Sequence, residues 1–374
     1  MDINVKVKPN LRIRAFYLFF IISSIQLGVG IMGVPRLIFM ESHQDAWISI
    51  IFAFFYMLIV VLAMLIILKQ YDNADILGIQ IDIFGKWVGK LLGTVYIIHF
   101  AITLLSVLVT YIEVVQVFIA PGISNFVMGL LLISLIVYSI LGGLKIIVGV
   151  CFIFFLLSHW VLFLLIEPAY LMDLTHFQPA FQTSFTELLK GAKITSYTFI
   201  GFELLLLVYP FIQNKQKASM PVYIGIFWSS LIVLLVTVVS IGFFSPDQLE
   251  RREWALLNMF KIQSLPFIER FDYIVVTEWM MVVLPNMILL MWGIIYGMKR
   301  LYKIKQRTSL YAVAFLLLIF CVFIDQHFLI QKVIDNIAKT SFWLVYVYPL
   351  LLLPIVLIKK RWKKRKGDGR HLSN

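Results

Sequence analysis

Charged residues are scarce in this chain. They make up 14% of the 374 residues, whereas 61% are hydrophobic and the mean hydropathy is +0.94. A soluble domain of this length carries roughly 25% charged residues. The composition therefore excludes a soluble enzyme or binding domain, and it predicts an integral membrane protein in a lipid bilayer.

Cysteine and enzymatic motifs are also nearly absent. The two cysteines, Cys151 and Cys321, each lie inside an apolar run, so we expect buried free thiols rather than a disulfide framework. The chain has no phosphate-binding glycine loop, no HExxH, no CxxC pair and no nucleophile elbow. The sequence therefore predicts no catalysis, no metal site and no cofactor.

Long apolar runs are abundant. About twenty apolar residues cross a bilayer as a helix, and this chain has ten runs of that kind. We predict an all-α membrane protein that forms a single membrane domain over 1–374, with an N-terminal segment at 1–15 and a basic tail at 359–374. The ten predicted spans cover residues 16–38, 47–68, 91–119, 126–143, 146–166, 194–212, 220–244, 273–298, 310–329 and 341–358.

The lysines and arginines orient these spans. The net charge is +12, but the basic residues lie between the apolar runs and in the tail, which indicates membrane topology rather than a nucleic-acid partner. With ten spans, 23 of the 32 basic residues fall on the side that carries the two termini. Cytoplasmic loops collect lysine and arginine, so both termini are predicted to be cytoplasmic. The basic tail is interpreted as an anchor that touches anionic lipid, and the alternative is docking of a partner.

Two connections between spans contain further structure. The segments 183–191 and 247–260 are each predicted to form a short interfacial helix. Ser245, followed by Pro246 and Asp247, is a plausible N-cap for the second of them.

Span one is interrupted by glycine and proline. Gly28, Gly30 and Gly33 precede Pro35 in the middle of the run. An unsatisfied amide in lipid costs several kcal/mol, so non-helical backbone survives only inside protein or beside a wet cavity. One interpretation is close packing of helices on small residues. The other is a set of free amides at the start of a half-helix, aimed at an anionic group such as a carboxylate.

Span six is interrupted at the corresponding place of the second half. Gly201 loosens the run 198–203, and Glu203 puts a carboxylate where hydrocarbon is expected. A carboxylate inside a span faces a cavity or a partner group. Glu203 is therefore a structural acid, a ligand for an ammonium group, or a proton-linked gate. Interrupted spans at matching positions in two halves indicate the binding site of an inverted-repeat transporter fold.

Other polar residues lie within the spans. Asn286 follows Pro285 in span eight, where a structural kink and a ligand contact are equally compatible with the pattern, and Tyr111 lies in span three. His99 and His159 are interpreted as hydrogen-bonded structural residues, with proton handling by His159 as the alternative.

Together these features resemble a known family. Ten spans, the sequence Gly33-Val34-Pro35-Arg36 and the 198–203 run Thr-Phe-Ile-Gly-Phe-Glu are similar to the B subunits of bacterial spore germinant receptors. These are small relatives of the amino acid–polyamine–organocation transporters, and the resemblance extends over residues 10–360. It implies a five-plus-five inverted repeat with broken helices 1 and 6, and a pocket between spans 1, 3, 6 and 8. It also implies a place in the inner membrane of the spore, beside a receptor A subunit and a lipoprotein C subunit.

The resemblance also implies roles for individual residues. The glycines of span one would offer amides to a ligand carboxylate, the second break would face the ligand from the other half, and two side chains would complete the wall. The predicted ligand-binding residues are Gly28, Gly30, Gly33, Tyr111, Thr198, Gly201, Phe202, Glu203 and Asn286.

Coupling residues of transporting relatives are missing. The centre of span eight, 282–289, has no Ser or Thr for a sodium site of the kind some relatives hold, and span five has no lysine. The predicted function is therefore a membrane subunit that senses a small nutrient, such as an amino acid, and signals to its partners. A proton-coupled amino-acid transporter is the alternative, and a structural subunit with a vestigial pocket is a third hypothesis.

Overall fold

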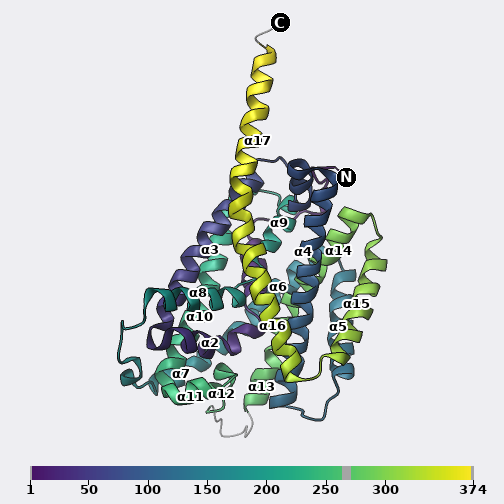
Figure 1. Ribbon diagram of the computed structural model, residues 1–374. Helices are drawn as coiled ribbons and strands as arrows, with labels where there is room; N and C mark the ends of the chain where they lie inside the picture. Colours follow the sequence, from purple (N-terminus) through teal and green to yellow (C-terminus); the bar gives the residue numbers. More distant parts are fainter. Residues whose placement is uncertain (1, 263–270, 372–374) are drawn as a thin grey trace.

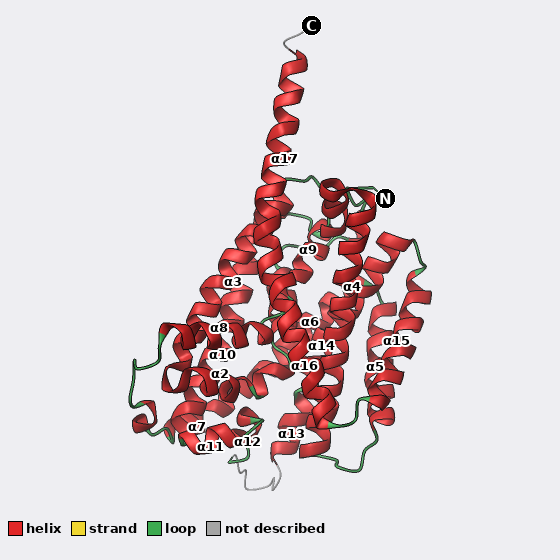
Figure 2. Cartoon of the chain, in the orientation of Figure 1, coloured by secondary structure: helices red, strands yellow, loops and turns green. Residues whose placement is uncertain are grey.

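The structure is a computed structural model that describes residues 2–262 and 271–371, with side chains described as far as Trp362. Every named element in these ranges is a helix (Figure 2). Extended pairing in the same ranges is limited to two isolated bridges, Asn4 with Ala74 and Ile13 with Ile212. The predicted all-α fold is confirmed.

The first half of the chain runs from α1 to α7. Its helices are α1 (Tyr17–Gln26), the 3₁₀ turn η2 (Val29–Met32), α2 (Val34–Ser42), α3 (Ala46–Lys69), α4 (Ile76–Phe118), α5 (Asn125–Leu141), α6 (Leu144–Ser158), the 3₁₀ helix η4 (His159–Leu165) and α7 (Ile166–Tyr170).

The second half runs from α8 to α17. Its main helices are α8 (Phe185–Thr198), the 3₁₀ turn η6 (Phe202–Leu204), α9 (Leu205–Val208), α10 (Ser219–Phe243), α11 (Pro246–Arg251), α12 (Ala255–Phe260), α13 (Phe271–Glu278), α14 (Met280–Tyr302), α15 (Gln306–Phe323), α16 (His327–Ser341), the π-helical turn η9 (Phe342–Val347) and α17 (Tyr348–His371).

These helices account for the predicted spans. Seven helical segments in the described ranges are long and apolar enough to cross a membrane, and α8 forms one further bent span with 202–211, at an angle of 56°. Two shorter apolar helices, α1 and α5, complete the set. Span one is thus divided between α1 and α2, and span six between α8 and α9, which confirms that helices 1 and 6 are broken.

The two halves pack in a matched way. Helix α1 of the first half packs against α10 of the second. Helix α8 of the second half packs against α3 of the first (Figure 1). Helix α4 packs against α14, and α5 packs against α15 at one edge of the bundle. The third and fourth spans of one half, α4 and α5, pack against the third and fourth spans of the other half, α14 and α15. The first span of each half packs against the second span of the other half. This arrangement is typical of a five-plus-five inverted repeat.

Both termini lie at one end of the bundle, here called the termini end (Figure 1). Helix α17 passes through the predicted boundary at residue 358 and continues to His371, so the tail is an extension of the last span. Lysine and arginine are good helix formers, and the basic run contains no glycine before Gly367. A tail composed of them therefore prolongs the helix.

Some predicted boundaries are wrong. The segment 183–191 is no separate interfacial helix, because α8 begins at Phe185 behind a capping box of Ser184 and Glu187 and is the first half of span six. Its polar composition is tolerated because one face packs against α2 and α3. Helix α4 begins at Ile76 rather than 91 and includes a break at Gly85, where φ is 83°.

Three smaller predictions can be compared with the structure. The segment 247–260 forms two helices, α11 and α12, instead of one. Ser245 is the N-cap of α11, as predicted, and its hydroxyl accepts a hydrogen bond from the Gln248 N–H. Cys151 and Cys321 are buried free thiols, also as predicted.

Close packing of α8 on the first half generates a prediction. A Cβ at Gly191 would lie 2.2 Å from Oγ of Ser42 and 2.6 Å from Oγ of Ser49. We expect Gly191→Ala to destabilise the protein by about 1–3 kcal/mol, as overpacking does. The thermal unfolding midpoint in detergent measures this. Gly149→Ala, also in a helix but with open space around the new methyl group, is the control. Equal midpoints for the two variants would contradict the packing described.

Candidate functional site

The break in span one frees a set of backbone donors. Helix α1 ends at Gln26, Leu27 is extended, and Gly28 has φ −142° and ψ −151° before η2 begins. Among the described residues, the N–H groups of Gly28, Val29 and Gly30 have no hydrogen-bond acceptor. They are the unpaired donors that any helix start leaves behind, here within a membrane-spanning segment.

The break in span six depends on a left-handed glycine. Gly201 has φ 112°, and a Cβ at this position would lie 2.6 Å from Cγ1 of Ile25. Only glycine combines that backbone conformation with so close an approach to α1. The second break is therefore pressed directly against the end of the first half-helix.

Two amide side chains connect the breaks. Gln26 Nε2 donates to the carbonyl oxygen of Phe199 at 3.2 Å and to Sδ of Met57 at 3.0 Å. Asn286 Nδ2 donates to the carbonyl oxygen of Ile25 at 2.7 Å. Each amide thus satisfies a carbonyl group beside a break, and together they join spans one, six and eight.

Glu203 is bonded to the second break and to α4. Its Oε2 accepts from the N–H of Gly201 at 2.7 Å, and its Oε1 lies 2.9 Å from Nε2 of His99 on α4. Glu203 is 1% exposed. The sequence predicts His99 as a hydrogen-bonded structural residue but does not predict its partner, because nothing in the sequence aligns α4 with the second break.

A small cavity lies between the two breaks. Its volume is about 30 Å³, room for about two water molecules. Five of the nine predicted ligand-binding residues line it: Gly28, Gly30, Thr198, Gly201 and Asn286. Gln26 and Thr103 line it as well. Their signal in the sequence is a polar side chain within an apolar span, in the case of Gln26 only two residues before the first glycine.

The cavity wall carries buried polar atoms without partners. Among the described residues, Oε1 of Gln26, Oγ1 of Thr103 and Oδ1 of Asn286 accept or donate no hydrogen bond. Leaving a buried polar group unpaired costs about 1–3 kcal/mol. Unpaired polar atoms and free N–H donors in the lining of one cavity are the arrangement expected where a polar ligand binds.

The remaining predicted residues lie outside this cavity. Gly33 packs under the loop before α12, where a Cβ would lie 2.8 Å from the carbonyl oxygen of Glu253. Tyr111 donates its hydroxyl to the carbonyl oxygen of Val276 at 3.3 Å. The Phe202 ring packs edge-on against Tyr346 at 5.3 Å, and Glu203 faces His99.

His159 has both ring nitrogens engaged. Its Nε2 accepts from Nε1 of Trp228 at 3.0 Å, and its Nδ1 faces the carbonyl oxygen of Phe155. These contacts favour the neutral tautomer with its proton on Nδ1. His159 and Trp279 line a second cavity of about 50 Å³. Leu27 and Ile31 of the first break and Leu256 and Phe260 of α12 line it as well.

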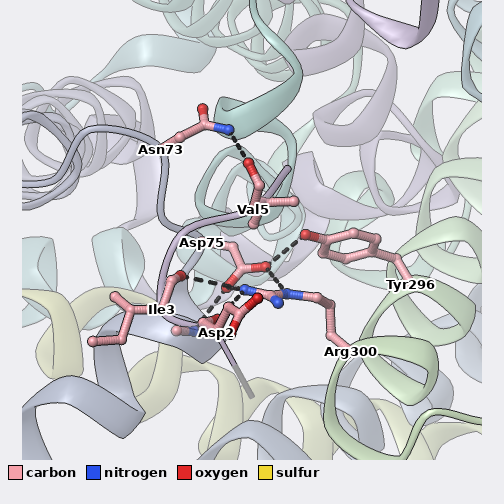
Figure 3. Close-up of polar contacts among 8 residues, drawn as sticks. Asp2, Ile3, Val5, Asn73, Asp75, Tyr296 and Arg300 are labelled. Carbon is pink, nitrogen blue, oxygen red and sulfur yellow. Dashed lines mark hydrogen bonds and ion pairs between the residues drawn. The ribbon is translucent and has the colours of Figure 1, made fainter. Parts of the chain in front are cut away.

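The termini end of the site is closed by a buried ion pair. Asp75 at the start of α4 accepts from Arg300 Nε at 2.9 Å and from the Tyr296 hydroxyl at 2.6 Å (Figure 3). Arg300 Nη2 also donates to the carbonyl oxygens of Asp2 and Ile3, at 3.0 and 3.3 Å. Residues 2–13 therefore form a strap over this end, called here the N-terminal strap.

The N-terminal strap is fixed at further points. Asn73 donates to the carbonyl oxygen of Val5, and the Val5 N–H donates back to the carbonyl oxygen of Asn73 at 2.7 Å (Figure 3). At its other end, the Ile13 N–H donates to the carbonyl oxygen of Phe211 at 2.9 Å, at the last residue of the second broken span. The strap thus connects both halves.

The opposite end is closed by side chains from three elements. His327 begins α16, and its Nδ1 lies 2.6 Å from Oε1 of Glu113 on α4. Its Nε2 lies 3.6 Å from Oε1 of Glu253, which precedes α12. The Glu253 carbonyl covers Gly33. No group of three or more His, Cys, Asp or Glu suited to a metal ion occurs in the part of the chain that the structure describes.

With both ends closed, the site is too small for an organic ligand. Ligand pockets usually measure about 300–1,000 Å³, whereas this cavity measures about 30 Å³. Binding of a nutrient-sized molecule would require the two breaks to separate.

Comparisons with known proteins agree with this architecture. Residues 12–329 match the family model described as spore germination protein. The chain is similar to spore germination protein GerQB of Bacillus cereus, at 32% identity over 91% of this chain and 95% of that protein. It is also similar to spore germination proteins YndE and A2 of Bacillus subtilis, at 24% and 20% identity over 96% and 94% of this chain, and 98% and 97% of theirs.

A solved structure shares the fold. It is a Na⁺-coupled sialic acid symporter in a substrate-bound, outward-open state, with a TM-score of 0.62 and 9% identity. The match covers 94% of this chain and 77% of the symporter. At this identity the likeness establishes the fold alone, which this chain shares with that symporter.

The buried pair on the second break generates a prediction. We expect His99→Leu and Glu203→Leu each to lower the free energy of unfolding by about 1–3 kcal/mol, because each leaves its partner unpaired. The double variant should lose less than the sum of the two. Thermal unfolding in detergent measures the cycle. A parallel cycle of Glu203→Leu with His159→Leu should be additive, and additivity in the His99 cycle would refute the pairing.

Proposed function

Since the chain belongs to the spore germination protein family, we propose that it is the nutrient-sensing membrane subunit of a spore germination receptor. A small nutrient, such as an amino acid, binds between the two breaks and shifts the balance between two arrangements of the repeats. A ligand shifts such a balance only by its different affinity for the two states. The alternative is a proton-coupled amino-acid transporter of the same fold.

The polarity of the cavity is the observation that carries this proposal. Free N–H groups at Gly28–Gly30 suit a carboxylate. Unpaired oxygens on Gln26 and Asn286 suit an ammonium group on the same ligand. Donors and acceptors in the lining of one cavity therefore favour a zwitterion. Glu203 lies next to the cavity wall, because its Oε2 accepts from the N–H of the lining residue Gly201.

Several contacts favour sensing over transport. The amide of Asn286 already donates to the Ile25 carbonyl, which is the kind of freed carbonyl that coordinates a cation in transporters of broken-helix type. Glu203 is bonded to His99 and Gly201, and both nitrogens of His159 are engaged. A proton carrier would have to break one of these arrangements.

Topology and partners form a second part of the proposal. We place the termini end in the cytoplasm, because it collects 23 of the 32 basic residues under the ten-span topology. The chain would lie in the inner membrane of the spore, beside receptor A and C subunits. Rearrangement of the breaks would reach those subunits through the termini end, where the N-terminal strap and α17 are exposed.

A deletion strain separates the two candidate functions. We expect its spores to lose the response to one nutrient of a panel, while uptake of labelled amino acids by growing cells stays normal. Germination is scored by loss of optical density, and the chain supplied in trans should restore it. Normal germination together with lost uptake would mean a transporter.

Filling the cavity tests the site itself. A Cβ at Gly30 would already lie 3.4 Å from Oγ1 of Thr198, so the side chain of Gly30→Leu would occupy the cavity. We expect this variant to remain in the membrane but to need at least tenfold more nutrient for half-maximal germination. Gly149→Leu, which faces open space, is the matched control. A wild-type dose–response curve for Gly30→Leu would remove the cavity from the mechanism.

A further inference from the structure

We propose that a second site, at the termini end, binds the headgroup of an anionic phospholipid. It is a cavity of about 730 Å³, called here the basic cavity, between the N-terminal strap, the turn from α5 to α6, and the junction of α14 with α15. Its cationic lining residues are Lys6, Lys8, Lys299, Arg300, Lys303 and Arg307.

The charge of the basic cavity is unbalanced. Asp2 is the one carboxylate among its lining residues. Within the described ranges Arg300 alone of the six cations forms an ion pair, with Asp75 at 2.9 Å. The other five side chains are exposed. Like charges gathered beside low-dielectric walls repel one another and raise the local concentration of anions.

The position of the basic cavity suits a lipid. Four span ends meet there: the end of α5, the start of α6, the end of α14 and the start of α15. Basic pockets between transmembrane helices at a membrane surface are typical binding sites for anionic headgroups. The site therefore lies at the depth of the phosphates of one leaflet.

Its apolar wall favours an amphiphile over a free anion. Leu141, Leu144 and Leu310 line the basic cavity on the side of α5, α6 and α15. Further along these helices, apolar side chains stay exposed, with Tyr138 80% and Phe315 65% accessible. A phospholipid would place its phosphate among the cations and its chains along this flank, whereas inorganic phosphate would leave the apolar wall unused.

Occupancy would act on the closure of the termini end. Docking of the N-terminal strap brings Lys6 and Lys8 toward the cations at the end of α14, at a cost in repulsion. A bound headgroup neutralises that repulsion. It thereby stabilises the strap beside the Asp75–Arg300 pair, and with it the closed arrangement of the candidate ligand site.

The test uses the full chain purified in uncharged detergent. Phosphatidylglycerol should raise the thermal unfolding midpoint and remain bound in native mass spectrometry, whereas phosphatidylcholine should do neither. Added salt should weaken the effect, because it screens the contacts. Equal effects of the two lipids would overturn the proposal. So would an equal effect of glycerol phosphate at the same phosphate concentration, which would identify a free anion as the occupant.

Variants locate the lipid. The triple variant Lys299→Gln, Lys303→Gln, Arg307→Gln should retain at least tenfold less phosphatidylglycerol. The matched control removes three exposed lysines that do not line the basic cavity: Lys190→Gln, Lys332→Gln, Lys339→Gln. It should retain lipid as the wild type does, and an equal loss in the control would overturn the proposal.

A second variant guards against misfolding of the first. Lys6→Gln with Lys8→Gln alters only the N-terminal strap and leaves every membrane helix unchanged. Reduced retention of phosphatidylglycerol in this folded variant supports the basic cavity, and wild-type retention overturns it.

Discussion

Backbone groups freed inside a membrane must find partners in the protein, and this requirement governs the centre of the molecule. At the two breaks, Gln26, Asn286 and Glu203 supply those partners. Gln26 and Asn286 each bond a carbonyl group of another span, whereas Glu203 bonds an N–H group of its own break. Gly201, with its left-handed backbone, permits the contact between the two breaks. The polar side chains that looked like ligand contacts are therefore also structural. A ligand would compete with, or complete, bonds that already hold the fold together.

This double use bears on the proposed shift between two arrangements. In the closed arrangement the carbonyls are capped by amides, while several oxygens and the amides of the first break stay unpaired. Each unpaired buried group raises the free energy of the closed arrangement by about 1–3 kcal/mol relative to one in which the group is hydrogen-bonded. A ligand that pairs them recovers this free energy. The gain is of the size needed to move a two-state equilibrium severalfold or more.

Much of this architecture could be predicted from the sequence. Hydrophobic runs gave the spans, and the glycines at 28 and 201 marked both breaks because glycine in an apolar span is a local signal. Three-dimensional pairings were out of reach. The partner of Glu203 is His99, 104 positions away. The polar helix α8 forms half of a span because it packs closely against Ser42 and Ser49, and its own composition does not indicate this. Such pairings depend on how helices align, which a single sequence does not record.

The last span has the geometry of a lever arm. Its joint, η9, touches the second break, because Tyr346 packs against Phe202 and donates its hydroxyl to the carbonyl oxygen of Ser196. From that joint α17 runs as one helix of 24 residues, and projects beyond the bundle (Figure 1). At 1.5 Å per residue its length is about 36 Å, so a tilt of about 5° at the joint would swing its far end by about 3 Å. A movement of the buried breaks that tilted this joint would therefore be larger at the far end of α17 than at the breaks themselves.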